Sequence, residues 1–74
     1  MTPAQIGTII RLARVSQKLR QDQLAAAAGV GVRFLIELER GKPTVQLGKV
    51  LAVLNALGCL VEITPPLNPP GNGS

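Results

Sequence analysis

Apolar residues recur at helical spacing along most of the chain, and the first run of them covers residues 3–18. One stripe of this run is apolar, as in a helix that packs one face against a core, and its members are Ile6, Ile10 and Ala13. Thr2 and Gln5 form a capping-box pattern around Pro3, a residue that favours the first position of a helix. We therefore predict a helix from Pro3 to about Lys18.

Three further helices are predicted between residues 21 and 57. The second covers residues 21–28, and the third runs from residue 32 to about residue 40. We expect Thr44 to cap the fourth helix, whose apolar residues repeat at three and four positions as far as Leu57. The last three helices are each followed by a residue type that readily adopts the left-handed conformation of a helix end, namely Gly29, Gly41 and Gly58.

After Gly58 the apolar pattern changes to a period of two, which predicts one short strand over residues 59–64. A lone strand leaves its backbone groups unpaired, so we expect it to pair with its copy in a second subunit. Residues 65–74 are rich in Pro, Gly and Asn and read as a flexible tail. The predicted architecture is an all-α domain of four helices over residues 1–58, a dimerisation strand over 59–64, and the tail.

Composition supports a small domain that gains stability by association. A chain of 74 residues with Phe34 as its only aromatic residue can bury only a thin core. Its free energy of unfolding should therefore be about 3 to 5 kcal/mol or less. Lys and Arg number eight against four Asp and Glu, a net charge of +4. This charge suggests a polyanionic partner, with nucleic acid ahead of a membrane surface.

Several functions are disfavoured by the residues present. No apolar run approaches the 18 or so residues of a membrane span, and no secretory signal pattern opens the chain. Cys59 is the single cysteine, which argues against a disulfide framework or a zinc site and fits a cytoplasmic protein. With no histidine and no acidic group suited to acid–base work or metal binding, we expect a non-enzyme without cofactor or metal.

The second and third predicted helices are joined only by Gly29-Val30-Gly31, a tight turn typical of the helix-turn-helix arrangement. If Leu35 and Leu38 hold the third helix against a core, its outward face carries Val32, Arg33, Ile36 and Glu37. This is the face that would enter a major groove. There Arg33 would read guanine, while Val32 and Ile36 would contact thymine methyl groups.

Residues 6–58 resemble the lambda-repressor-like, or Xre-type, helix-turn-helix family. The resemblance is carried by Gln21, Leu24-Ala25, Ala28-Gly29-Val30, Phe34-Leu35 and the segment from Glu37 to Lys42. The stretches FLIELERGKPT and LGKVLAVLNALGCLVEITP are similar to one branch of that family, the HipB-like antitoxins of toxin–antitoxin operons.

The resemblance implies a role in DNA binding for several positions. Gln21, which opens the second helix, would hydrogen-bond a phosphate, and Lys42 would meet the DNA backbone. Val32, Arg33 and Glu37 would lie over base edges. Two departures from the family pattern weaken helix caps, because Arg20 and Gly31 stand where Ser or Thr is usual.

The resemblance also implies two structural contacts and a set of partners. Arg14 would pair with Glu39, and a ribbon between subunits would be formed by Cys59, Leu60, Val61, Glu62 and Ile63. The partners would be double-stranded DNA with an inverted-repeat operator, a second copy of the chain, and a toxin such as a HipA-like kinase. The protein would then be a repressor of its own operon.

Alternatives remain at the level of residues and of function. Glu37 would either accept a hydrogen bond from cytosine or hold Arg33 through an i, i+4 pair. Val32 and Ile36 could instead form a protein-docking patch or belong to the core. The chain could correspondingly be a module whose main task is toxin capture, or a phage-type or general Xre regulator without a toxin.

Overall fold

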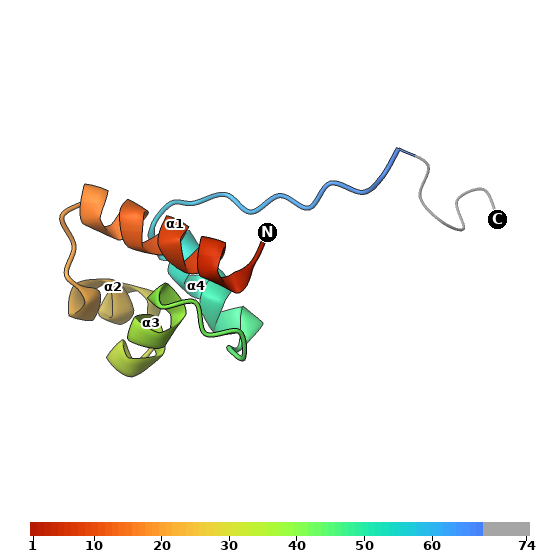
Figure 1. Cartoon of the computed structure of the whole chain (residues 1–74). Helices are drawn as coiled ribbons and strands as arrows, with labels where there is room; N and C mark the ends of the chain where they lie inside the picture. Colours follow the sequence, from red (N-terminus) through yellow and green to blue (C-terminus); the bar gives the residue numbers. More distant parts are fainter. Residues whose placement is uncertain (68–74) are drawn as a thin grey trace.

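The computed structural model describes residues 1–67 and contains four α-helices in that part of the chain (Figure 1). They are α1 (Pro3–Ser16), α2 (Gln21–Ala28), α3 (Val32–Glu39) and α4 (Leu47–Ala56). The four-helix prediction is therefore confirmed. Over the described residues, no helix has the length and apolar character needed to cross a membrane. The greater part of the predicted tail, residues 68–74, lies outside the described residues.

The capping box at the start of α1 is formed by the residues that predicted it. The Thr2 hydroxyl accepts the Gln5 N–H at 3.1 Å, and the Gln5 side-chain oxygen accepts the Thr2 N–H at 2.8 Å. The helix ends at Ser16, two residues earlier than predicted. Lys18 adopts a left-handed φ of 59°, which turns the chain out of the helical path towards α2.

The turn between α2 and α3 follows from Gly29. Its φ of 71° is left-handed, a conformation that costs glycine little, and it lets the chain reverse within three residues. Neither Arg20, whose side chain has no acceptor, nor Gly31, which has no side chain, caps the first N–H groups of α2 or α3. At α2 one local bond remains, from the Arg20 N–H to the Gln23 side-chain oxygen at 2.9 Å. Tertiary packing must therefore hold these two eight-residue helices in place.

That packing comes from one apolar core to which all four helices contribute. Its most deeply buried side chains are Ile10, Leu24, Leu35 and Val53, one from each helix. At Gly7 the backbone of α1 approaches α3 so closely that a Cβ atom there would collide with the carbonyl oxygens of Leu38 and Glu39. The core and this close contact fix α3 with one face inward and one face outward.

The predicted cap of the fourth helix is wrong. Residue Thr44 is exposed and lies outside the helix, which begins at Leu47 with Gln46 in the cap position and no side-chain cap bond. The physical reason is the side chain of Val45, which packs against the core from the loop. The connection between α3 and α4 is consequently a seven-residue loop rather than an early helical turn.

The strand predicted at residues 59–64 is also absent from the isolated chain. The segment leaves the end of α4, borders a hollow with α1 and α4 as far as Glu62, and then runs away from the helices without a strand assignment (Figure 1). Its last backbone hydrogen bond into the helices is from the Cys59 N–H to the Leu54 carbonyl, at 2.9 Å. Strand pairing requires a second extended segment, and residues 1–67 of one chain offer none. Pairing across a dimer is thus a proposal, treated below.

Candidate nucleic-acid interface

The outward face of α3 carries the side chains that the sequence placed there. Leu35 and Leu38 are buried on the opposite side, while Arg33 is exposed and Val32 is 39% exposed. Ile36 is half-buried and lies between them on the helix surface. The face therefore combines one exposed cation with two apolar side chains, as a surface that touches both base edges and methyl groups requires.

Glu37 pairs with Lys42 rather than with Arg33. The Lys42 ammonium donates to the Glu37 carboxylate at 3.3 Å, and both side chains remain partly exposed. The alternative in which Glu37 holds Arg33 is therefore not the arrangement found. Within residues 1–67, Arg33 makes no ion pair or side-chain hydrogen bond, so its guanidinium is available to a ligand.

Arg14 and Glu39 join α1 to the end of α3 through two parallel hydrogen bonds. Arg14 donates from Nε at 2.6 Å and from Nη2 at 3.0 Å, and the two side chains are only 13% and 4% exposed. The remaining nitrogen, Nη1, donates to the Leu19 carbonyl at 2.8 Å. The hydrogen bond to Glu39 raises the pKa of Arg14 against the opposing effect of desolvation, and the charge of Glu39 raises it further.

Gln21 belongs to the same hydrogen-bonded group. Its side-chain N–H donates to the Glu39 carboxylate at 3.1 Å. A primary amide has two N–H donors, so this bond leaves a second one for a phosphate oxygen. The structure thus brings together Arg14, Gln21 and Glu39, while Glu37 and Lys42 form a separate pair on the outer side of α3.

Two further contacts, one at the start of α2 and one between α3 and α4, were not predicted from the sequence. Arg20 donates to the Asp22 carboxylate at 3.0 Å, and this bond lowers the pKa of Asp22. The ammonium of Lys49, in α4, lies 5.6 Å from the ring centroid of Phe34 in α3. The sequence shows that Phe34 is the sole aromatic side chain, but it does not show that Lys49 is the cation that lies over its ring.

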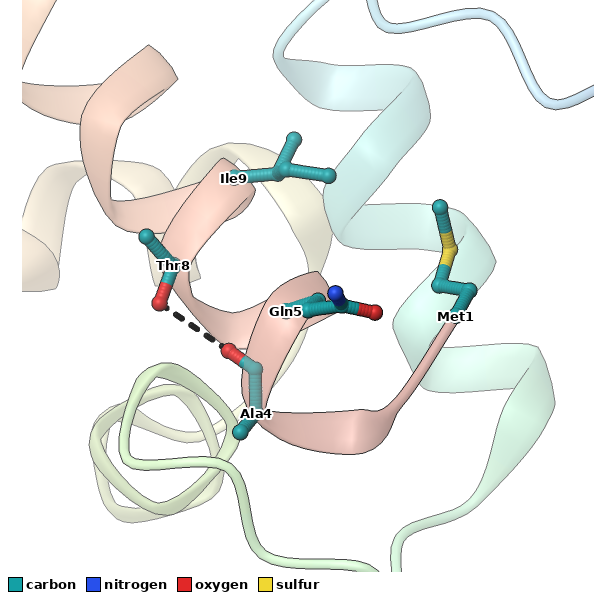
Figure 2. Close-up of a pocket in the computed structure, with 5 residues that line it drawn as sticks. All are labelled: Met1, Ala4, Gln5, Thr8 and Ile9. Atoms are coloured by element: carbon teal, nitrogen blue, oxygen red, sulfur yellow. Dashed lines mark hydrogen bonds between the residues drawn. The ribbon is translucent and has the colours of Figure 1, made fainter.

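The first turns of α1 border an open hollow (Figure 2). It is lined by Met1, Ala4, Gln5, Thr8 and Ile9. The Thr8 hydroxyl is engaged with the Ala4 carbonyl at 3.0 Å, so it is not poised as a nucleophile. In the part of the chain that the structure covers, no group of three His, Cys, Asp or Glu residues is placed to hold a metal ion.

Two short helices joined by a glycine turn, packed on each side against another helix and presenting an exposed arginine, define a helix-turn-helix DNA-binding domain. Residues 10–62 match the protein family described as Helix-turn-helix. An uncharacterized HTH-type transcriptional regulator, y4mF of Sinorhizobium fredii, is 58% identical over 65 residues, which cover 88% of this chain and 86% of that protein. The chain belongs to the Xre-type helix-turn-helix family of DNA-binding transcriptional regulators.

Proposed function

We propose that this regulator is a sequence-specific repressor, and specifically a HipB-like antitoxin that represses its own toxin–antitoxin operon and binds the toxin. The observation that carries the DNA-reading part is the exposed guanidinium of Arg33 on the outward face of α3, which has no ion-pair partner within residues 1–67. Arginine is the commonest reader of guanine, because its planar fork bonds the O6 and N7 atoms together.

The neighbouring side chains supply the remaining contacts of this proposal. Val32 and Ile36 would touch thymine methyl groups, and Gln21 would donate its second amide hydrogen to a phosphate. Lys42 would exchange the Glu37 carboxylate for a DNA phosphate. Glu37 would then be free to accept a hydrogen bond from a cytosine amino group.

A dimer would let two α3 helices read one operator. Beyond the Cys59 N–H, which is bonded to Leu54, the extended segment as far as Ile63 has unpaired backbone groups and exposed apolar side chains, with Leu60 and Ile63 each 90% exposed. Pairing this segment with its copy would give the backbone groups hydrogen-bond partners and would cover the apolar side chains. Two recognition helices related by a two-fold axis reach successive major grooves about 34 Å apart, so the operator would be an inverted repeat.

The antitoxin part of the proposal is supported by the similarity of residues 34–44 and 47–65 to HipB-like proteins. The toxin would be a HipA-like kinase. A regulator of the same fold without a toxin would use the same DNA-reading residues, so the two alternatives differ only in a protein partner. Co-purification of the chain with the product of an adjacent reading frame distinguishes them.

The test of DNA reading is fluorescence anisotropy with the DNA upstream of the gene and with a scrambled duplex, from about 50 to 200 mM salt. We expect binding to the upstream DNA to persist at the higher salt, where the scrambled duplex is lost. Arg33→Ala should weaken upstream binding by about 1 to 3 kcal/mol. Equal and steeply salt-dependent binding to both duplexes would refute sequence-specific reading.

A second candidate function is a module whose main task is toxin capture. It is favoured by the apolar side chains of Val32 and Ile36, the former 39% exposed, which would suit a protein surface. Arg33→Ala separates the two functions, because it should weaken operator binding and leave toxin capture unchanged. Loss of toxin capture in this variant would show that α3 is the toxin-binding face.

A further inference from the structure

Lys49, in α4, contacts α3 through Phe34, and the DNA-binding function proposed above assigns no role to this contact. Its ammonium lies over the ring of Phe34, 5.6 Å from the centroid, within the range of a cation–π attraction. Phe34 itself is half-buried against the core, so its ring is a firm support. The contact restricts where an otherwise exposed and mobile cation can be.

Phe34 and Glu39 mark the two edges of the outward face of α3. At about 100° per residue, Phe34 and Glu39 point about 140° apart across the buried side of the helix. The buried Leu35 and Leu38 fall between them on that side, and Arg33 lies between them on the exposed side. Gln21 is bonded at the Glu39 edge, and Lys49 is bound at the Phe34 edge. Two potential phosphate donors thus flank the reading face.

A helix that enters a major groove has a sugar–phosphate strand along each side. The proposed role of Gln21 supplies a donor for one strand only. Lys42 approaches the other edge, but to bind a phosphate it must first give up its ion pair with Glu37, at 3.3 Å. Lys49 forms no ion pair in the described part of the chain, so its charge is uncompensated.

We infer that Lys49 binds a DNA phosphate on the strand opposite the one that Gln21 contacts, with the ring of Phe34 positioning its ammonium. This inference rests on the proposed DNA-binding function. The ring occupies one side of the ammonium and leaves N–H donors on the other for phosphate oxygens. Because the side chain is already confined, less conformational entropy is lost when it binds.

The test is the salt dependence of binding for Lys49→Gln, measured with the upstream and the scrambled duplex. Loss of one phosphate contact should make the slope of log affinity against log salt shallower by about 0.9, so the loss of affinity from 50 to 200 mM becomes about 3.5-fold smaller. The change should be equal for both duplexes, because phosphates carry no sequence information. Lys49→Arg keeps the charge and should keep the slope.

Gln5→Glu is the matched control. It lowers the net charge by the same one unit, and Glu can still complete the capping box. Gln5 lies two residues from Gly7 and hence on the other side of α1 from the contact with α3 (Figure 2). If Gln5→Glu changes the slope as much as Lys49→Gln, the effect is one of net charge and the inference fails. A wild-type slope in Lys49→Gln would also overturn it.

The role of the ring is tested by Phe34→Leu, with its fold checked by circular dichroism. We expect binding to both duplexes to fall about two- to fivefold with the slope unchanged, because the charge remains and only its positioning is lost. Unchanged affinity in this variant would refute positioning by the ring. Failure of the wild-type chain to bind either duplex would instead refute the proposed function, which these variants presuppose.

Discussion

The Arg14–Glu39 pair is a residue-scale feature that joins α1 to the end of α3. Both groups are largely buried, so removing one partner leaves the other without compensation, at a cost of about 3 kcal/mol or more. We predict that Arg14→Met lowers the free energy of unfolding by that amount, which is most of the margin of so small a domain. Urea unfolding followed by circular dichroism measures it.

The control for this prediction is the double variant Arg14→Met, Glu39→Leu. Apolar side chains replace both charges, so no buried ion is left unpaired and part of the stability should return. A single variant as stable as the wild type, or a double variant less stable than the single one, would show that the pair does not stabilise the fold in this way.

Asp22, at the start of α2, should make the stability of the fold depend on pH in the acid range. Its pKa is lowered from 3.8, first by the hydrogen bond from Arg20. A carboxyl group whose pKa is lower in the folded state stabilises the fold above pH 3.8, and this contribution disappears as the pH falls through the lowered value. We therefore expect Asp22→Asn to lower the urea midpoint slightly at pH 6 and by less at pH 2. An equal difference at both pH values would contradict this assignment.

At the scale of elements, the crossing of α1 over α3 depends on the missing side chain of Gly7. A methyl group there would meet the carbonyl oxygens of Leu38 and Glu39, so α1 would have to shift. We predict that Gly7→Ala lowers the free energy of unfolding by about 1 to 3 kcal/mol, although alanine is the better helix former. The melting temperature and the urea midpoint should both fall.

Gly48 provides the matched control within the same molecule. It lies in the first turn of α4, and a Cβ atom there would meet nothing within 4 Å. Gly48→Ala should therefore stabilise the chain by about 0.5 to 1 kcal/mol, through the unfolded state and helix propensity. Destabilisation by both substitutions would mean that the close approach at Gly7 is not the cause.

The elements that were predictable from the sequence are those specified by neighbouring residues. The apolar repeats, the Thr2 and Gln5 capping box and the Gly29 turn act within a few positions, and they predicted the four helices. Thr44 was assigned as a cap because local pattern cannot show that Val45 packs into the core. The segment after α4 alternates like a strand, but a strand exists only when a second one lies beside it.

At the candidate site too, the features set by neighbouring residues were predictable and those set by distant residues were not. The outward positions of α3 follow from helical periodicity once Leu35 and Leu38 are assigned to the core. The expected pairing of Arg14 with Glu39 came from family resemblance, because the two residues are 25 positions apart and no local pattern joins them. Glu37 pairs with Lys42 rather than with Arg33 because of the path that the loop takes after α3, and the sequence did not predict that path.

At the scale of the whole molecule, the dimer proposal predicts that residues 59–63 control both association and operator binding. Val61→Pro removes a backbone donor from the centre of the paired segment. We expect sedimentation equilibrium at micromolar concentration to show a wild-type dimer and a monomeric variant, with operator binding greatly weakened. Leu67→Pro, outside the segment, should remain dimeric. A monomeric wild-type chain, or a dimeric Val61→Pro variant, would refute strand pairing.

The carboxylate of Glu39 has a consequence for genetic studies of this regulator. It accepts hydrogen bonds from Arg14, which holds the fold, and from Gln21, which is proposed to contact DNA. A screen for loss of repression would therefore recover substitutions at Glu39 alongside true DNA-contact residues, although this side chain is 4% exposed and faces inward. Such alleles should be separable by temperature, since cooling can restore a folding defect but cannot replace a missing DNA contact.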